Sequence, residues 1–206
     1  MSNIILANID DLADKDLKDD QYDNSLEIQS SIDDRIYFKF NSVNLVIGKR
    51  GSGKTYTVMR EILKLAYLMK QYDANGWDDE VRYTQVYYIT DKLRDDTCQR
   101  AQYYIENKTS MQFIWEKTEN ALDLIQYISM IKAFLADPSQ YDEDLQNPEF
   151  IHECMDVINY HPPDTDEGRK QPLPHTVIIF DDCIGLFNKY SPLSKKLFEN
   201  RQTRIT

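Results

Sequence analysis

Residues 48–55 read Gly48-Lys49-Arg50-Gly51-Ser52-Gly53-Lys54-Thr55. This run fits the spacing G-x-x-x-x-G-K-[ST], in which glycines let the backbone turn tightly and direct several N–H groups at phosphate oxygens. The lysine of such a loop contacts the terminal phosphates, and the hydroxyl after it contacts Mg²⁺. The run therefore predicts a binding loop for a nucleoside triphosphate, lined by all eight residues, with Lys54 on the phosphates and Thr55 on the metal.

Both flanks have the composition that such a loop requires. The preceding residues are Val43-Asn44-Leu45-Val46-Ile47, a short apolar run rich in β-branched side chains, which predicts a buried strand. Over residues 55–72 the apolar side chains recur at helical spacing without Pro or Gly, which predicts a helix. Such a helix points the positive end of its dipole at the bound phosphate. Because strand, loop and helix follow in the required order, a chance match in a glycine-rich turn is disfavoured.

The composition indicates one soluble globular domain. The chain has 206 residues, of which 41% are hydrophobic and 29% are charged. No apolar run approaches the ~20 residues of a membrane helix, and the first residues include acids but no basic apolar leader, so we expect neither a membrane-spanning segment nor a secretion signal. Three scattered cysteines favour buried thiols in a reducing setting over a disulfide framework or a zinc site; they are Cys98, Cys154 and Cys183.

The negative charge is concentrated near the N-terminus. The net charge is −11, and residues 1–34 carry −8 of it, with ten acidic residues and two lysines. We therefore predict an acidic arm over residues 1–34 and a nearly neutral nucleotide-binding domain over residues 35–206. The arm is either a solvated tail or a segment that contacts a neighbouring subunit or covers a basic groove. The acidic total does not exclude DNA as a partner, because the local field governs that contact.

The rest of the chain alternates strands with helices. Strands are predicted where β-branched and aromatic residues gather, at 35–40, 83–90, 111–115 and 176–180. Apolar spacing predicts helices at 92–106, 118–135 and 148–159. Asp91 is expected to cap the first of these helices, and residues 161–174, rich in Pro and charge, to form a loop. This alternation predicts an α/β fold with a mostly parallel sheet and helices on both of its faces.

Two carboxylates follow the last predicted strand, in Thr176-Val177-Ile178-Ile179-Phe180-Asp181-Asp182. Ligands of open α/β sheets bind at the carboxyl ends of the strands, so we expect this fully buried strand to place the pair at the nucleotide. Since successive strand residues point in opposite directions, the two acids are expected to have different roles. Asp181 would hold Mg²⁺ through its water shell, and Asp182 would orient or deprotonate the attacking water. The alternative is that the two aspartates only cap the turn after the strand. It is disfavoured because the residues that follow, 183–187, are mostly apolar.

Other chemistries lack their characteristic residues. The three histidines have no metal-ligand spacing and are expected in loops or on the surface; they are His152, His161 and His175. The sequence has no G-x-S-x-G nucleophile motif. The candidate site is therefore predicted from the glycine loop and the paired carboxylates.

Together these residues resemble the genome-packaging ATPases of large nucleocytoplasmic DNA viruses. That is the poxvirus-type packaging group, within the FtsK–HerA superfamily of P-loop NTPases. The resemblance extends from about Phe38 to the end of the sequence and is carried by residues 48–55, Tyr88-Ile89-Thr90-Asp91, Phe180-Asp181-Asp182 and Leu197-Phe198-Glu199-Asn200-Arg201. It implies a RecA-like core, a homo-oligomeric ring, and hydrolysis of ATP with Mg²⁺ to move double-stranded DNA into a capsid. It also implies capsid or portal-vertex proteins as partners, and a location in the host cytoplasm (the viral factory) or the virion.

The resemblance assigns roles to individual residues. Lys54 and Thr55 take the Walker A roles, and Asp181 and Asp182 take the Walker B roles. Arg201 matches an arginine that reaches a neighbour's phosphate, a contact worth several decades in rate in related hydrolases. Arg204 is the alternative, and a surface arginine is the other interpretation of both. The expected catalytic residues are thus Lys54, Asp182 and Arg201.

One feature departs from the family pattern. In this fold class a further strand with a polar sensor residue lies between the two Walker strands. The sequence ends at Ile205-Thr206, where that strand would begin. We therefore expect a core that is incomplete at its C-terminal end, either because the chain is truncated or because the strand is supplied otherwise. A gap in the sheet would expose unpaired backbone groups.

The partner and the reaction are left with alternatives. Residues 189–204 hold five basic residues and one acidic residue, which favours either a DNA-facing patch or a solvated helix face. No base-reading motif is present, so DNA binding is expected to be independent of sequence. An ATP-binding switch or assembly protein with weak hydrolysis stays open, as does a small-molecule kinase. The paired acids favour the motor over the kinase.

Overall fold

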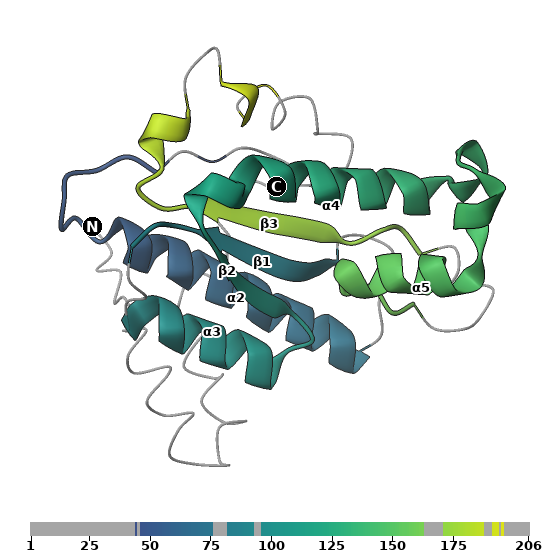
Figure 1. Ribbon diagram of the computed structural model, residues 1–206. Coiled ribbons are helices and arrows are strands. Elements are labelled where there is room, and N and C mark those ends of the chain that lie inside the picture. The colour runs from purple at the N-terminus through teal and green to yellow at the C-terminus, as the bar shows by residue number, and fades with distance from the viewer. Residues whose placement is uncertain are drawn as a thin grey trace. The chain divides into compact units, whose positions relative to one another are not determined.

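The computed structural model describes residues 44, 46–75, 82–92, 96–162, 171–187, 191–193 and 195. The chain divides into two compact units. Among the described residues, the first unit contains the 48–55 loop, helix α2 (Lys54–Asn75) apart from its last residue, and helix α3 (Asp96–Lys108). The second unit contains the sheet and the other helices among the described residues (Figure 1). The predicted arm (1–34), the predicted strand at 35–40, Arg201 and Arg204 lie outside the described residues.

Among the described residues, three parallel strands form the sheet of the second unit, in the order β2-β1-β3. They are β1 (Tyr83–Ile89), β2 (Gln112–Glu116) and β3 (His175–Phe180). The central strand β1 is buried along its whole length, as expected for a strand with a parallel neighbour on each side. The strands predicted at 83–90, 111–115 and 176–180 are thereby confirmed, and so is the coarse α/β class with a parallel sheet.

Helix α4 (Ala121–Ala136) lies along one face of the sheet (Figure 1). Its Ala121, Ile125 and Ile128 are buried in one cluster with Tyr87 and Ile89 of β1. A single 3₁₀ turn, η2 (Thr118–Asn120), precedes α4, so the predicted helix at 118–135 is confirmed. It ends before Pro138, because the residue before a proline is pushed out of the helical conformation.

Alternate residues of the strands point to the other face, as the two-residue period of a strand requires. There Tyr88 of β1 contacts two aromatic rings of β2. Its ring centroid lies 6.0 Å from that of Phe113 and 4.9 Å from that of Trp115. These contacts favour the observed register of β1 against β2, since a slip of β1 by one residue would turn Tyr88 to the face opposite to the two β2 rings.

Helix α5 (Pro148–Val157) follows two short turns, η3 (Pro138–Gln140) and η4 (Glu143–Gln146). The side-chain oxygen of Asn147 accepts a hydrogen bond from the Phe150 backbone N–H at 2.8 Å, a typical N-cap. Cys154 of α5 and Ile158 share a core cluster with Phe134 of α4. The helix predicted at 148–159 is therefore confirmed, two residues shorter at its end.

The start of β3 is held by buried polar groups. Lys132 of α4 is buried, and its Nζ donates to the Pro174 carbonyl oxygen at 2.7 Å and to the Thr176 hydroxyl at 2.9 Å. His175, the first residue of β3, is also buried, and its ring lies 5.2 Å from that of Tyr83. The prediction that His175 lies in a loop or on the surface is wrong, because strand pairing begins one residue earlier than expected. His152 and His161 are exposed, as predicted.

The described residues of the strand predicted before the glycine loop do not form a strand. Asn44, Val46 and Ile47 have no regular structure, and Ile47 is 83% exposed. A strand needs a neighbour to satisfy its backbone groups, and the sheet order offers these residues no partner within the described part of the chain. An apolar, β-branched composition is therefore insufficient here to produce a strand.

Strand β3 is only partly buried, in contrast to the prediction of a fully buried strand. His175 and Thr176 are buried, while residues 177–180 are half-buried. Within the described residues β3 pairs with β1 alone, so its other edge has no partner there. Apolar residues at the edge of a sheet keep part of their surface exposed, which accounts for the difference.

The helix predicted at 92–106 exists as α3 but begins four residues later, at Asp96, with Lys92 in a bend.

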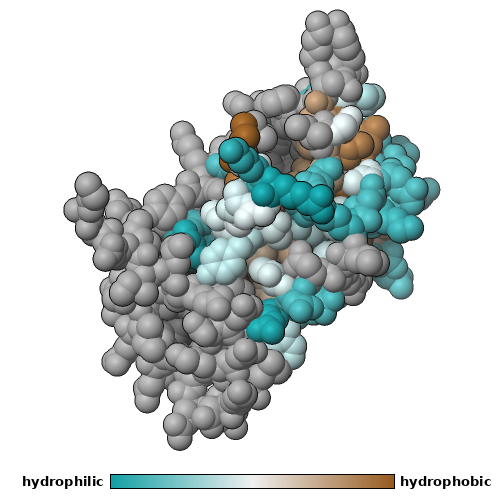
Figure 2. All heavy atoms as spheres, turned by 90° about the vertical axis from the view of Figure 1, so that its left-hand side faces the viewer, coloured by the Kyte–Doolittle hydropathy of each residue, from teal (hydrophilic) through white to brown (hydrophobic). Residues whose placement is uncertain are grey.

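Most of the described surface in the view of Figure 2 is hydrophilic, with smaller hydrophobic areas. Six large hydrophobic side chains are exposed among the described residues, namely Ile47, Tyr103, Tyr127, Met130, Leu145 and Phe187. No described helix is both long and apolar enough to cross a membrane.

Candidate functional site

The glycine loop of the first unit turns tightly and contains two glycines with positive φ. Gly51 and Gly53 have φ values of +75° and +76°, in the left-handed region that glycine enters without penalty. A Cβ added at Gly48 would lie 2.5 Å from the Ser52 Oγ, so the loop closes tightly on itself there. The Ser52 N–H donates to the Lys49 carbonyl oxygen at 3.2 Å, which completes the turn.

The loop leads directly into the N-terminus of α2. Lys54 is the first residue of this 22-residue helix, and Thr55 is the second; both are half-buried. Residues 48–53 are exposed and therefore accessible to a ligand. The dipole of a helix gives its N-terminal end a partial positive charge, which favours a bound anion.

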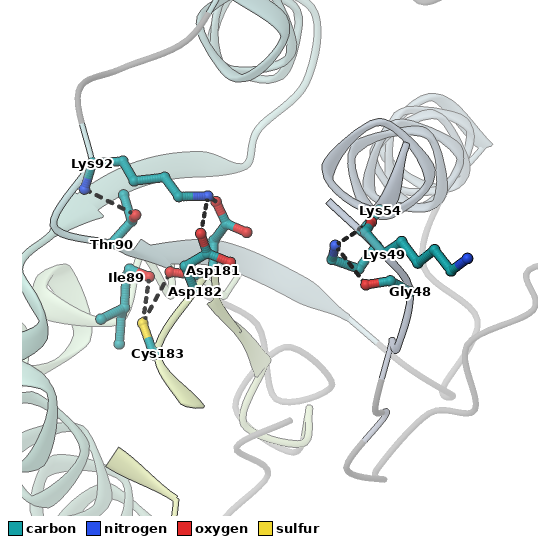
Figure 3. Close-up of polar contacts among 9 residues, drawn as sticks. All are labelled: Gly48, Lys49, Lys54, Ile89, Thr90, Lys92, Asp181, Asp182 and Cys183. Atoms are coloured by element: carbon teal, nitrogen blue, oxygen red, sulfur yellow. Dashed lines mark hydrogen bonds and ion pairs between the residues drawn. The ribbon is translucent and has the colours of Figure 1, made fainter. Parts of the chain in front are cut away.

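The Lys54 ammonium group lies over the loop. Its Nζ donates to the carbonyl oxygens of Gly48 and Lys49, each at 3.1 Å (Figure 3). Both contacts are hydrogen bonds from a charged donor to neutral acceptors, so a phosphate oxygen, which is itself charged, would be a stronger acceptor for the same group. The position of Lys54 thus suits the role that the motif predicts for it.

The second candidate group lies at the carboxyl edge of the sheet in the second unit. Asp181 and Asp182 follow β3, and both contact one lysine, Lys92, which follows β1. The Lys92 Nζ is 3.0 Å from the Asp181 Oδ2 and 2.7 Å from the Asp182 Oδ2 (Figure 3). The hydrogen bond with Asp182 is the largest influence on the pKa of Lys92. Together with Asp181 it raises that pKa above its usual value, against the opposing effect of desolvation.

Alternation along a strand predicts that the two aspartates point in opposite directions. Instead, both side chains contact Lys92. The Asp181 N–H still donates to the Ile89 carbonyl oxygen at 3.0 Å, but Asp182 has left the strand with a φ of +55°. This left-handed conformation, tolerated by Asp and Asn better than by most residues, turns the second carboxylate toward the same ammonium group. The pair therefore forms one anionic cluster around the Lys92 counter-ion.

Asp91 also has a different role from the predicted one. Its carboxylate accepts a hydrogen bond from the Thr118 backbone N–H at 3.1 Å and another from the Thr118 hydroxyl. It therefore binds the turn after β2 rather than capping α3. The cause is the parallel sheet, which brings the carboxyl ends of β1 and β2 to the same edge. The two bonds from Thr118 hold the pKa of Asp91 below its usual value.

Cys183 lies directly after the aspartate pair and is buried. Its Sγ lies 3.1 Å from the Asp181 carbonyl oxygen and 3.3 Å from the Ile89 carbonyl oxygen. Burial first, and then the nearby carboxylates, raise the pKa of this thiol to about 11. Cys183 packs in the same core cluster as Ile125 and Ile128. All three cysteines are free and buried, as predicted.

Lys92 is the residue of this site that sequence reasoning missed. A signal for it exists in the chain: Lys92 comes three residues after the end of β1, and the aspartates directly follow β3. Parallel neighbours end at the same edge of a sheet, so a basic residue after one strand meets acidic residues after the next. The signal depends on knowing that β1 and β3 are neighbours, and the sequence alone does not provide the strand order.

The chemistry of these residues fits the predicted ligands. Adjacent carboxylates are the donors that Mg²⁺ prefers, and an exposed glycine loop at a helix N-terminus suits phosphate. Within the described residues no group of three or more His, Cys, Asp or Glu side chains is arranged to hold a metal ion. A magnesium ion here would keep much of its water shell and take one or two protein ligands.

Comparison with known proteins gives no further guide. No family model, no curated protein and no solved structure matches this chain. The loop belongs to the first unit and the aspartate pair to the second, so their sharing of one magnesium ion stays a prediction. Function is therefore inferred from the chemistry of each group.

Proposed function

We propose that this chain binds ATP with Mg²⁺ through residues 48–55 and hydrolyses it. The observation that carries the proposal is the loop: two left-handed glycines, exposed loop residues and the Lys54 ammonium group lie together at the start of α2. Each of these features has a direct use in holding a triphosphate, and all of them come from residues adjacent in sequence.

In the proposed reaction the chain mainly positions groups and neutralises charge. Water attacks the γ-phosphorus in line, the bond to the ADP oxygen breaks, and the proton of the water is transferred as the new P–O bond forms. Lys54 neutralises charge on the phosphates, and Thr55 and Asp181 are the candidate ligands of Mg²⁺, which withdraws charge from the same oxygens when bound. Asp182 orients the water or accepts its proton.

A RecA-like core is part of the proposal. The aspartate pair follows a strand that is parallel to its neighbour, and the other edge of that strand carries no partner within the described residues. This edge is where the proposed family places its sensor strand. The core also requires residues 43–47 to join the sheet, and their described members do not do so here.

The motor role follows from the resemblance to packaging ATPases. By that resemblance we propose a homo-oligomeric ring that translocates double-stranded DNA into a capsid, in the host cytoplasm or the virion. Capsid or portal-vertex proteins are the proposed partners. Arg201, or else Arg204, is the proposed contact to a neighbouring subunit's phosphate.

One observation favours a second candidate function. The carboxylates proposed for the metal and the water are both held by Lys92. An ATP-binding switch or assembly protein with weak hydrolysis would show this arrangement in its resting state. The two functions differ in turnover, so one assay separates them.

The test measures ATP binding and ATP hydrolysis, each with and without duplex DNA. Lys54→Ala is expected to weaken ATP binding strongly, because it removes the ammonium group that lies over the loop. Asp182→Asn is expected to keep ATP binding and to lower turnover by about 10²- to 10⁴-fold, the usual contribution of a general base. Asparagine is chosen because it tolerates the left-handed backbone at this position.

Lys117→Ala serves as the matched control. Lys117 is 72% exposed at the same edge of the sheet and pairs only weakly with Glu119, at 3.8 Å. This variant loses one positive charge and is expected to behave as the wild type.

The outcomes distinguish the two functions. Stimulation of ATP hydrolysis by DNA in the wild type, lost in Lys54→Ala and Asp182→Asn, supports the motor. Binding without turnover supports the switch, and ATP binding unaffected by Lys54→Ala would refute both.

A further inference from the structure

Lys92 is tied to the aspartate pair by its backbone as well as by its side chain. Its N–H donates to the hydroxyl of the buried Thr90 at 3.2 Å, which fixes the bend after β1. From this bend the side chain extends to Asp181 and Asp182 (Figure 3). The ammonium group therefore starts from an anchored position rather than from a freely moving loop.

The two aspartates differ in their access to solvent. The Asp181 side chain is 15% exposed, whereas those of Asp182 and Lys92 are 64% and 48% exposed. Water can stabilise the Asp182 charge, but the more enclosed Asp181 depends on a positive partner. Lys92 provides that partner, and its own exposure leaves it room to move away into water.

The carboxylates of Asp181 and Asp182 can be neutralised by Lys92 or by a divalent ion, but they hold only one of these cations closely at a time. Two carboxylates and one ammonium group leave a net charge of −1, enough to attract a divalent ion. A divalent ion in contact with the Asp181 oxygen would lie within a few ångströms of the Lys92 nitrogen, where like charges repel. The ion and the ammonium group therefore compete for the same oxygen atoms.

We propose that Lys92 is a built-in counter-cation, which a divalent metal ion must displace before it can bind Asp181. This inference rests on the proposed function, since it concerns the same metal ligand. Lys92 is thereby a positioning residue. It keeps the two carboxylates together until the metal arrives, and it sets the metal concentration at which the exchange occurs.

The experiment uses the full chain and Mn²⁺ alone, without nucleotide. Mn²⁺ binding is measured from the loss of the free-ion signal in electron paramagnetic resonance, at low ionic strength. Lys92→Met and Lys92→Gln are expected to bind Mn²⁺ about three- to tenfold more tightly than the wild type, an effect that shrinks as salt is added. Lys92→Arg keeps the charge and is expected to stay close to the wild type.

Three controls make the result specific. Lys117→Met removes a charge from the same edge without touching the aspartates and is expected to change nothing. Asp181→Asn, combined with Lys92→Met, is expected to abolish the gain. Circular dichroism and thermal unfolding confirm that each variant is folded.

A second measurement follows Lys92 itself. In the wild type, the nitrogen resonance of the Lys92 ammonium group is expected to move toward that of the exposed Lys117 on saturation with Mg²⁺.

The outcomes separate this inference from the proposed function. Equal Mn²⁺ affinity of the wild type and the folded Lys92→Met and Lys92→Gln variants overturns the counter-cation and leaves ATP binding untouched. A Lys92 resonance that stays in place while Mg²⁺ binds does the same. Absence of Mn²⁺ binding in every variant overturns both the inference and the proposed metal ligand.

Discussion

The Asp91 carboxylate is held in its charged form by Thr118, through one side-chain and one backbone hydrogen bond. These bonds lower the pKa of Asp91 from its usual value of 3.8. A carboxyl group with a lower pKa in the folded state than in the unfolded state stabilises the fold above the unfolded value. That contribution is lost as the pH falls through the folded pKa.

Thr118→Val tests this assignment. The change removes the hydroxyl donor and keeps the backbone N–H, so the pKa of Asp91 is expected to rise toward 3.8. The variant should be less stable than the wild type at neutral pH, and the difference should vanish in acid. Carbon NMR titration of the carboxyl group and urea unfolding at several pH values measure the two effects.

Ser139→Ala is the matched control for Thr118→Val. The Ser139 hydroxyl donates to Asp137 at 2.5 Å and lowers the pKa of that carboxyl group. Its removal is expected to affect Asp137 and to leave Asp91 unchanged. A stability difference that persists below the pKa of Asp91 would contradict the assignment.

Individual residues could be predicted where their role is local. The glycines and Lys54 were identified from spacing alone, because the loop is built from residues adjacent in sequence. Lys92 and the partner of Asp91 were missed, because both contacts join residues far apart in the chain. Such contacts are set by the order of the strands, which local sequence does not specify.

At the scale of elements, the glycine loop has a backbone conformation that restricts which residues can occupy it, because Gly51 and Gly53 have positive φ. Gly53→Ala places a Cβ in open space, with nothing within 4 Å, so its effect comes from the backbone alone. A φ of +76° costs a side-chain-bearing residue about 1–2 kcal/mol. The free energy of unfolding is expected to fall by about this amount, and ATP binding is expected to weaken as the loop relaxes.

Gly185→Ala is the control for the loop. Gly185 also has nothing within 4 Å of an added Cβ, but its φ is not positive. Its substitution is expected to change stability by less than about 0.5 kcal/mol. Urea unfolding and ATP titration compare the two variants. Equal effects at Gly53 and Gly185 would show that the left-handed backbone is not what the loop depends on.

Elements with a clear period or composition were predicted well. Helices α2, α4 and α5 and strands β1, β2 and β3 lie where their patterns place them. The strand expected at 43–47 was predicted from composition alone, and composition does not provide a neighbouring strand. The partial burial of β3 was missed for the same reason, since burial depends on what pairs with its second edge.

At the scale of the whole molecule, the loop and the aspartate pair are expected to act on one magnesium ion. Asp181→Asn should then weaken binding of ATP in the presence of Mg²⁺ and leave binding of ATP in excess chelator unchanged. Thr55→Ala should give the same pattern, because Thr55 is the other candidate ligand. Fluorescent-nucleotide titrations with and without Mg²⁺ measure this.

The control for this prediction is Glu119→Gln. Glu119 is exposed at the same edge and contacts only Lys117 among the ion pairs of the described residues. Glu119→Gln removes one negative charge without altering the aspartate pair. Binding of ATP in the presence of Mg²⁺ is therefore expected to stay as in the wild type. An Asp181→Asn variant that binds Mg-ATP as tightly as the wild type would indicate that the two groups serve separate ligands.

The central place of β1 has a consequence for synthesis on the ribosome. One neighbour, β2, follows shortly after β1, but the other, β3, begins only at His175, after α3, α4 and α5. A nascent chain therefore emerges with β1 complete, and the edge of β1 that later pairs with β3 is still without a neighbour. Long-range pairing of this kind folds slowly and leaves time for aggregation. Chaperone protection during translation is accordingly most needed between the exit of β1 and the exit of β3.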